Sequence, residues 1–211
     1  MATLHFLPAT MSDRKALRRR LRAARAALAP AERARASRAL AWHVLRSPWY
    51  LRARRIAFYL PNDGEVDLQP LLLAAWQAGK QCFLPVLGGR WEPRLWFMPW
   101  TPGDDLVPNR YGILEPPLVR GRRTGHNWAL DLVLVPLVAV DRAGHRLGMG
   151  GGFYDRTFAY LRARRHWRRP HLMGTAFSFQ QVDHLEPAPW DVPLDSLATE
   201  RGVVSFPGRD P

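Results

Sequence analysis

The sequence predicts an α/β fold: a single domain with a mainly parallel central sheet flanked by helices and an N-terminal helical hairpin. Three observations lead to this prediction. Short apolar runs that suit buried strands alternate along the chain with runs of helical periodicity. A chain of 211 residues fits one domain with a sizeable core. The content of 47% hydrophobic and 23% charged residues is ordinary for a globular protein. Alternating strands and helices favour parallel pairing, because each helix carries the chain back across the sheet.

Two helices are expected at the start of the chain. The first runs from Ser12 to Leu28 and carries one apolar stripe at helical spacing. The stripe consists of Leu17, Leu21, Ala24 and Leu28. Pro30 stands where the first turn of the next helix begins, and that helix runs from Ala31 to Leu45 and stops before Pro48. The two helices form the predicted hairpin.

Strands and two further helices follow in alternation. Asp67 is placed to cap a helix that extends to Ala78 and closes on Gly79. The segment from Pro102 to Trp128 is rich in Pro, Gly and Arg, so we expect it to loop over the surface. A helix to Leu161 and a basic turn from Arg162 to Arg169 come later. The expected strands are Arg55–Leu60, Gln81–Val86, Leu95–Trp100, Leu130–Val140, His171–Phe177 and Leu197–Ser205.

The ends of the chain are expected to lie outside the domain. We expect residues 1–11 to form a flexible tail, residues 12–205 one catalytic domain, and residues 206–211 a second tail. The N-terminal segment lacks the features of a signal peptide, and no apolar stretch approaches the ~20 residues of a membrane span. A single cysteine, Cys82, forms no intramolecular disulfide and is expected to be a buried, inert thiol. These features predict a cytoplasmic protein.

Charge indicates a polyanionic ligand without identifying it. The net charge is +13, and of the 31 basic residues only Lys15 and Lys80 are lysine, so a general bias toward arginine contributes. A basic surface attracts nucleic acid, nucleotides or multiply carboxylated small molecules. The first helix carries four arginines at helical spacing: Arg14, Arg18, Arg22 and Arg25. Three interpretations stay open for them: a grip on phosphate by Arg14 and Arg18, a solvated face, or an RNA-binding face without interleaved aromatic residues.

A glycine cluster is the strongest local signal. The segment from Gly144 to Arg156, called the glycine loop below, holds five of the 16 glycines within nine residues, between an apolar strand and a helix. Glycines let backbone N–H groups approach an anion closely, and a carboxylate at Asp155 can hold a divalent cation that bridges phosphates. The loop does not match a Walker loop. It is not a dinucleotide fingerprint either, because Phe153 occupies the third glycine position of that motif. The alternative is a glycine turn that only lets a helix pack on a strand.

Three loops are expected to meet at the carboxyl ends of the parallel strands, where ligands bind in such folds: Pro61–Val66, Asp141–Tyr154 and Pro187–Leu194. Glu65 in the first loop is either an acceptor for an N–H-rich heterocycle or an ordinary loop acid. Asp191 and Asp195 are either turn residues or metal ligands. The histidines show no zinc spacing, and no G-x-S-x-G pattern indicates a nucleophile.

Five blocks in the sequence resemble one enzyme family. The glycine loop contains Arg-Leu-Gly-Met-Gly-Gly-Gly-Phe-Tyr-Asp (residues 146–155), which is similar to the R-L-G-x-G-x-G-Y-Y-D signature of the 5-formyltetrahydrofolate cyclo-ligase family, also called methenyltetrahydrofolate synthetase. The other blocks appear in family order over residues 12 to 205. They are Arg14–Arg18 (K-x-x-L-R), Leu60–Glu65, Tyr111–Pro116 (G-I-x-E-P) and Asp191–Asp195 followed by Ala198-Thr199-Glu200 (D-x-P-x-D and T-E).

The resemblance implies an ATP- and Mg²⁺-dependent cyclo-ligase that converts 5-formyltetrahydrofolate to 5,10-methenyltetrahydrofolate, with release of ADP and phosphate. It further implies a site for each ligand. The ATP site would comprise Arg14, Lys15, Arg18, Arg146, Leu147, Gly148, Met149, Gly150, Gly151, Gly152, Phe153 and Tyr154. The folate site would comprise Leu60, Glu65, Gly150, Gly151, Gly152 and Phe153, and Asp155 and Asp191 would bind Mg²⁺. In the family mechanism the formyl oxygen attacks the γ-phosphate and N10 then closes the ring.

Two positions depart from the family pattern. Arg14 stands in place of the usual lysine, with Lys15 beside it, and Phe153 replaces the first tyrosine of the signature. We expect a monomer that binds two small molecules and neither a membrane nor nucleic acid. The alternative from another class is a basic RNA-binding module on an inactive α/β scaffold. A sugar-phosphate isomerase or acyl-transferase on a similar fold would leave the arginine pair Arg14 and Arg18 unexplained.

Overall fold

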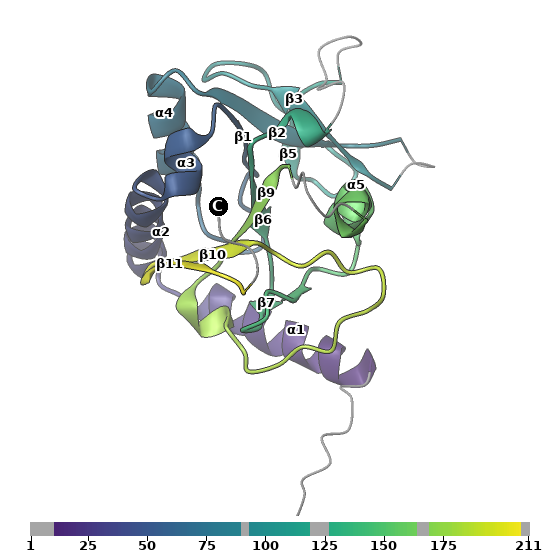
Figure 1. Cartoon of the computed structure of the whole chain (residues 1–211). Coiled ribbons are helices and arrows are strands. Elements are labelled where there is room, and N and C mark those ends of the chain that lie inside the picture. Colours follow the sequence, from purple (N-terminus) through teal and green to yellow (C-terminus); the bar gives the residue numbers. More distant parts are fainter. Residues whose placement is uncertain (1–10, 90–92, 119–126, 164–168, 208–211) are drawn as a thin grey trace, which may run out of the picture.

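A seven-stranded sheet forms the centre of the molecule (Figure 1). The computed structural model describes residues 11–89, 93–118, 127–163 and 169–207. The strand order is β11-β10-β9-β6-β1-β2-β3, and all pairs between β10 and β2 are parallel, whereas the two edge pairs are antiparallel. The predicted α/β class with a mainly parallel sheet is therefore confirmed.

The element bounds follow the alternation expected from the sequence. The helices are α1 (Met11–Ala27), α2 (Pro30–Leu45), α3 (Pro48–Arg52), α4 (Gln69–Gln77) and α5 (Phe153–Phe158), with 3-10 turns at Asn127–Ala129, Ala159–Arg162 and Ser178–Gln180. The strands are β1 (Arg55–Ala57), β2 (Gln81–Leu87), β3 (Leu95–Pro99), β4 (Val107–Pro108), β5 (Leu114–Glu115), β6 (Leu132–Pro136), β7 (Ala139–Val140), β8 (Arg146–Leu147), β9 (His171–Thr175), β10 (Ser196–Thr199) and β11 (Gly202–Ser205). None of the described helices is both long and apolar enough to cross a membrane.

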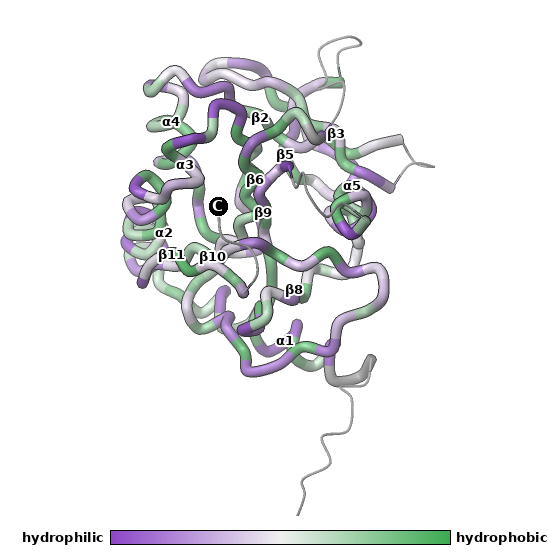
Figure 2. Tube along the Cα trace, viewed as in Figure 1, coloured by the Kyte–Doolittle hydropathy of each residue, from purple (hydrophilic) through white to green (hydrophobic). Residues whose placement is uncertain are grey.

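The central strand β6 separates two cores. Its successive side chains point to opposite faces, so Leu132 and Leu134 join the core under α2 and α4, while Val133 and Val135 join the core under α5. All four are fully buried, as expected for a strand covered by helices on both faces. Figure 2 shows the hydrophobic residues concentrated along β6 and its neighbours, with hydrophilic residues on the outer helices.

Helix α1 packs separately from α2. Its buried residue Leu21 belongs to a third cluster with Val138, Ala139 and Leu147, whereas α2 packs on the core that it shares with α4. Figure 1 accordingly shows α1 across the end of the molecule near β7 and α2 alongside α4. The two consecutive helices thus cover different parts of the fold, so the predicted helical hairpin is wrong. The reason is the apolar stripe of α1, which has its own partners beyond the end of β6.

The predicted strand Leu130–Val140 is divided in two. β6 ends at Pro136, and the chain leaves the sheet to form β7, which pairs with β8 in an antiparallel hairpin. The turn between them is closed by the buried Asp141, whose Oδ1 accepts backbone N–H groups of Ala143 and His145 at 2.9 Å each. This departure from the sheet positions the start of the glycine loop.

Other boundaries also differ from the sequence prediction. The last predicted strand is a hairpin of β10 and β11, the 102–128 segment contains the short β4–β5 hairpin, and α3 was not predicted. Leu68, not Asp67, is the N-cap of α4, although Asp67 Oδ1 accepts the N–H of Gln69 at 2.9 Å. The expected helix to Leu161 is the six-residue α5 followed by a 3-10 turn. Most of the basic turn predicted at Arg162–Arg169 lies outside the described residues, as do residues 1–10 and 208–211 of the predicted tails.

Phe206 belongs to the core, although the sequence placed it in the C-terminal tail. It is 5% exposed, and its N–H donates to Asp195 O at 3.0 Å. A Cβ on Gly144 would lie 2.8 Å from the Phe206 ring and 2.8 Å from Leu194 O, so this ring packs against a position that has room only for glycine.

Removing the Phe206 ring is therefore expected to destabilise the fold. We expect Phe206→Ala to lower the free energy of unfolding by about 3 kcal/mol, because it leaves a cavity in the core. Val204→Ala, in the neighbouring strand at 53% exposure, is the matched control and should change it by about 0.5 kcal/mol or less. Urea denaturation of both variants measures the difference. Equal stability of the two variants would show that the fold ends before Phe206.

Candidate active site

A pocket of about 500 Å³ opens at the carboxyl ends of β1, β2 and β6. The chain passes from β1 to β2 on one side and later returns as β6 on the other side, so the pocket lies where the strand order reverses. Open α/β sheets bind ligands at such a point. Its lining comprises Tyr59, Leu60, Asn62, Glu65, Pro85, Leu87, Leu95, Asn109, Tyr111, Ile113, Glu115, Pro136, Leu137, Arg146, Gly148, Met149, Gly151, Gly152, Phe153, Tyr154 and Asp155.

The pocket brings together residues that the sequence analysis selected from separate segments. Those that line it are Leu60, Glu65, Arg146, Gly148, Met149, Gly151, Gly152, Phe153, Tyr154 and Asp155. Six other selected residues lie outside the lining: Arg14, Lys15, Arg18, Leu147, Gly150 and Asp191. Leu147 is fully buried and packs with Leu21, so its side chain faces the core rather than a ligand.

The glycine loop bends because three of its residues adopt left-handed backbone conformations. Gly144 has φ +84°, Gly150 has φ +108° and Gly152 has φ +61°, and Gly152 is the N-cap of α5. Arg156 then reaches back from α5, donating from Nη2 to Gly151 O and from Nε to Pro93 O at 2.8 Å. The loop is thus held in a defined shape, with Gly148, Gly151 and Gly152 facing the pocket.

An ion pair between buried Arg146 and half-buried Asp155 closes the loop. Arg146 Nη2 donates to Asp155 Oδ1 at 2.7 Å, and Arg146 Nη1 donates to Val192 O at 2.7 Å. The N–H of Val192 donates to the same Asp155 oxygen at 3.0 Å. These three bonds join both ends of the glycine loop to the 187–194 loop. The two loops therefore lie side by side, as the sequence predicted.

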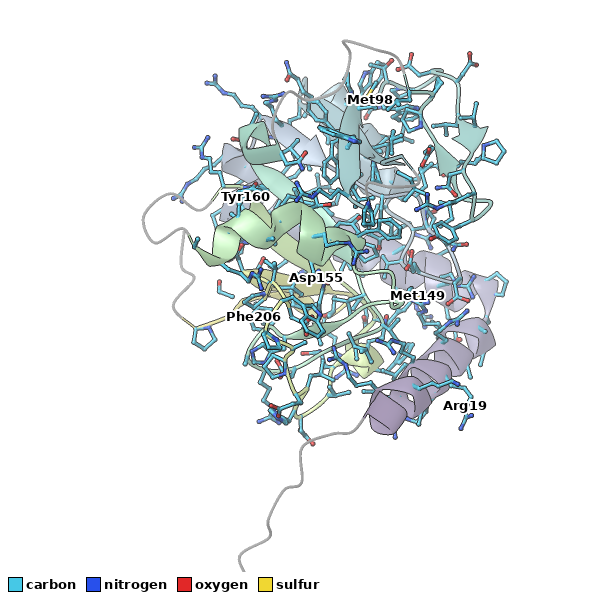
Figure 3. The ribbon with its side chains drawn as sticks, turned by 90° about the vertical axis from the view of Figure 1, so that its right-hand side faces the viewer. Arg19, Met98, Met149, Asp155, Tyr160 and Phe206 are labelled. Atoms are coloured by element: carbon cyan, nitrogen blue, oxygen red, sulfur yellow. The ribbon has the colours of Figure 1, made fainter. Side chains whose placement is uncertain are left out.

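The first half of α1 lies against the glycine loop. Arg18 Nε donates to Gly148 O at 2.8 Å, and Arg14 Nη2 forms an ion pair with Asp191 Oδ2 at 3.4 Å. Burial is the main cause that lowers the pKa of Arg18, the nearby Arg14 adds to it, and Asp191 opposes it. Figure 3 shows Met149 between Asp155 and α1, with Arg19 pointing outward from the helix. This end of the pocket therefore gathers cations from α1 and a carboxylate from each of two loops.

The second half of α1 lies against the Pro61–Val66 loop. Arg22 forms two bonds to Asp63, from Nε at 2.8 Å and from Nη2 at 3.1 Å, and Arg25 donates to the same carboxylate. Arg25 is fully buried, so the arginine stripe is neither one solvated face nor one phosphate-binding face. Arg14 pairs with Asp191 and Arg18 with Gly148 O, whereas Arg22 and Arg25 share Asp63.

Glu65 faces the pocket as a buried carboxylate. Its Oε2 accepts the N–H of Asn62 at 3.1 Å, and its Oε1 lies 3.8 Å from Arg25 Nη1. Burial raises the pKa of Glu65 to about 7, against the opposing effects of the Asn62 N–H and Arg25. A carboxylate in this state is an acceptor whose charge changes near neutral pH.

Two phenols beside Glu65 stay protonated. Burial, reinforced by the charge of Glu65, raises the pKa of Tyr59 and of Tyr154 above the usual value. Tyr59 Oη lies 2.9 Å from Thr175 Oγ1 and 3.2 Å from Val66 O. Sequence reasoning did not select Tyr59, because an aromatic residue at the end of a strand is typical of a core position.

The described residues hold no cluster of three or more side chains suited to a metal ion. Asp155 and Asp191 remain the candidates. Asp155 Oδ1 accepts bonds from Arg146 Nη2 and from the N–H of Val192, the residue next to Asp191. Mg²⁺ typically takes one or two protein carboxylates and completes its shell with phosphates and water, so this donor set fits it. Asp195 does not fit, because it is buried and its Oδ2 accepts the N–H of Leu172 at 2.8 Å.

The β4–β5 hairpin supplies lining residues that sequence reasoning missed. Glu115 Oε2 accepts the N–H of Leu87 and the side-chain amide of Asn109, each at 3.0 Å, which fastens the hairpin to β2. Tyr111 meets Phe153 edge to face, with ring centroids 6.1 Å apart. The available signal was the Tyr111–Pro116 block, whose resemblance was noted without assigning its residues to the site.

Comparisons with known proteins agree with this geometry. Residues 10–200 match the model of the 5-formyltetrahydrofolate cyclo-ligase family. The chain is 38% identical over 183 residues to the 5-formyltetrahydrofolate cyclo-ligase of Escherichia coli K12, covering 87% of this chain and 98% of the relative. It is 36% identical over 183 residues to the Haemophilus influenzae enzyme, covering 86% and 94%. The structure of Aquifex aeolicus 5,10-methenyltetrahydrofolate synthetase superposes with a TM-score of 0.77 at 32% identity, covering 94% of this chain and 95% of that one. The match of the family model over residues 10–200, together with two relatives at more than 30% identity along most of their length, shows that this chain belongs to the 5-formyltetrahydrofolate cyclo-ligase family.

Proposed function

We propose that this protein closes the ring of 5-formyltetrahydrofolate to give 5,10-methenyltetrahydrofolate, with conversion of ATP to ADP and phosphate. The observation that carries the proposal is a pocket of about 500 Å³ that the glycine loop, with Arg146 and Asp155, and the carboxylate of Glu65 line together. The glycine loop with Arg146 and Asp155 suits a polyphosphate, and the Glu65 carboxylate suits the N–H groups of a pterin. Family membership supports the same reaction.

In this proposal the phosphates of ATP lie between α1 and the glycine loop. Arg14 and Arg18 bring guanidinium groups to this end of the site, and Arg18 is already bonded to the loop at Gly148 O. Backbone N–H groups of the loop approach the phosphates where no Cβ intervenes, since a Cβ on Gly148 or Gly150 would meet nothing within 4 Å. Lys15, exposed on the same helix, adds charge without a placed partner.

The folate is proposed to lie in the deeper, apolar part of the pocket. Leu60 lines one wall, Glu65 offers its carboxylate to the pterin, and Phe153 with Tyr111 forms an aromatic wall. Gly151 and Gly152 let the formyl end approach the phosphate end closely. The reacting oxygen and the γ-phosphate then meet beside the glycine loop.

The chemistry needs positioning more than a protein nucleophile. The formyl oxygen attacks the γ-phosphorus, the bond from that phosphorus to ADP breaks, and an iminium phosphate forms on N5. N10 then attacks the activated carbon and loses its proton, and phosphate leaves with the former formyl oxygen. Guanidinium and backbone N–H groups stabilise the charge that develops on the phosphate oxygens. No described side chain has to form a covalent bond.

We propose that Asp155 and Asp191 hold Mg²⁺ in this site. Bound there, the cation would neutralise the phosphate charge and orient the γ-phosphate. Arg146 and the N–H of Val192 fix the position of the Asp155 carboxylate.

We further propose that the protein works in the cytoplasm as a monomer, with small-molecule substrates only. An RNA-binding role gains little support from α1, because Arg14, Arg18 and Arg25 turn toward protein partners. Arg22 pairs with Asp63 as well, so each of the four arginines in the stripe has a partner within the protein.

The first test is the complete reaction. We expect purified protein with 5-formyltetrahydrofolate, ATP and Mg²⁺ to produce the absorbance of the methenyl product, and omission of any component to abolish it. Absence of product in the complete mixture would contradict the proposed function.

Replacement of Asp155 tests the phosphate end of the site. We expect Asp155→Asn to lower kcat by roughly 100-fold, because the amide keeps the shape but loses the charge that holds a cation. Asp183→Asn is the control, since that carboxylate is 97% exposed and pairs only with Arg142 among the described residues. Steady-state kinetics at saturating Mg²⁺ distinguish the two. If kcat of Asp155→Asn stays within about twofold of the unmodified protein, Asp155 does not take part in the reaction.

Glu65 is expected to impose a pH dependence on folate binding. Its pKa of about 7 means that the carboxylate gains charge as the pH rises through neutrality. We therefore expect kcat/KM for 5-formyltetrahydrofolate to rise from pH 6 to pH 8 with a midpoint near 7. Glu65→Gln should remove this rise and increase KM for the folate while KM for ATP stays unchanged. An unaltered pH profile in Glu65→Gln would assign the titration to another group.

A further inference from the structure

Arg25 is the most deeply buried charged side chain in the described part of the protein. It lies in the last turn of α1, its side chain is 1% exposed, and three groups surround its guanidinium. Nη2 donates to Asp63 Oδ2, Nη1 lies 3.8 Å from Glu65 Oε1, and Nη1 also donates to Leu137 O at 3.3 Å. Arg25 thus contacts the Pro61–Val66 loop and the end of β6 at once. It does not line the pocket itself.

Stability alone does not account for this arrangement. Removing a guanidinium from water costs several kcal/mol, and apolar residues of similar size often stabilise a protein as well as a buried ion pair does. The pairing is also incomplete, because Arg25 Nε is buried without a hydrogen-bond partner. A costly and only partly satisfied charge at this point calls for a role in the site.

We propose that Arg25 is a positioning residue for folate recognition: it holds the Glu65 carboxylate toward the pocket in its charged form. This inference rests on the proposed function, in which Glu65 binds the pterin. The contact geometry supports it, because Arg25 and Glu65 approach from different elements, and only the Glu65 side reaches the pocket.

Among the charged groups around Glu65, Arg25 is the one that favours the charged carboxylate. The titratable groups that face Glu65 are Arg25 from α1, Asp63 from its own loop, Tyr59 after β1 and Tyr154 from α5. Of these described groups only Arg25 is a cation, and Asp63 acts in the opposite direction. Removal of Arg25 should therefore raise the pKa of Glu65 above about 7 and leave the carboxyl neutral at the pH where the unmodified protein carries a charge.

The same helix connects the two ends of the site. Arg18 bonds to the glycine loop, and Arg25, seven positions later, bonds to the Pro61–Val66 loop. Asp63 has a left-handed backbone with φ +51°, so its attachment to α1 also supports the turn that presents Glu65. Arg22 bonds to Asp63 from the exposed side, whereas the ion pair with Glu65 comes from Arg25. This difference between two arginines on one helix provides the test.

The experiment compares Arg25→Met with Arg22→Met in the full-length protein. We expect Arg25→Met to raise KM for 5-formyltetrahydrofolate about tenfold at neutral pH, and to move the acid limb of kcat/KM to higher pH. KM for ATP should stay within about twofold. Arg22→Met, which also removes an Asp63 bond, should leave the position of the acid limb unchanged. Arg25→Lys should restore the limb, because it returns the charge without the planar fork.

Each result decides between the proposals. If Glu65→Gln leaves KM for the folate unchanged, the proposed folate contact fails, and the role of Arg25 fails with it. If Glu65→Gln raises KM but Arg25→Met does not, only the inference on Arg25 is overturned. Equal shifts in Arg22→Met and Arg25→Met, or equal increases in both KM values, would mean that Arg25 serves structure alone. Should Arg25→Met fail to fold, Arg25→Lys decides: a limb at the unmodified position with a raised folate KM supports the proposal, and a displaced limb or an unchanged KM overturns it.

Discussion

The ion pair between Arg146 and Asp155 is the interaction on which the site depends. The two residues stand at the beginning and the end of the glycine-rich segment, so one contact of 2.7 Å closes it into a loop. Through Val192 the same pair fastens a second loop from the far end of the chain. The Arg146 side chain is buried, so leaving its charge without the Asp155 carboxylate is strongly unfavourable. The shape of the glycine loop therefore follows from electrostatics as much as from glycine flexibility.

The sequence predicted the elements whose signal is local. The apolar run of β6 and the helical periodicity of α2 needed no knowledge of distant partners, and the parallel sheet followed from their alternation. The glycine loop was also recognisable, because its composition is unusual at any position in a chain. Local signals predicted the site residues better than the ends of the strands. Hydrophobicity alone extended one predicted strand to Val140, whereas β6 ends at Pro136.

What the sequence did not reveal depends on contacts between distant residues. Arg22 and Arg25 are equivalent in spacing and residue type, yet only Arg25 is buried. The sequence does not show this difference, because the partners Asp63 and Glu65 come from a loop some forty positions away. The β4–β5 strands have two residues each, too few for any periodicity, and their place beside the pocket depends on the bonds of Glu115 to β2 and Asn109. A family resemblance marked this segment, but the role of its side chains required the fold.

The ion pair of Arg14 with Asp191 bears on the form in which a polyphosphate can enter. Each residue offsets the charge of the other, so their sum is neutral before any ligand arrives. A phosphate group that attracted Arg14 alone would leave the Asp191 carboxylate facing an anion. A polyphosphate that brings its own divalent cation satisfies both residues in a single exchange, with the total charge at this end balanced throughout. In the proposed ATP site, this pair would therefore favour a metal–nucleotide complex over the bare nucleotide.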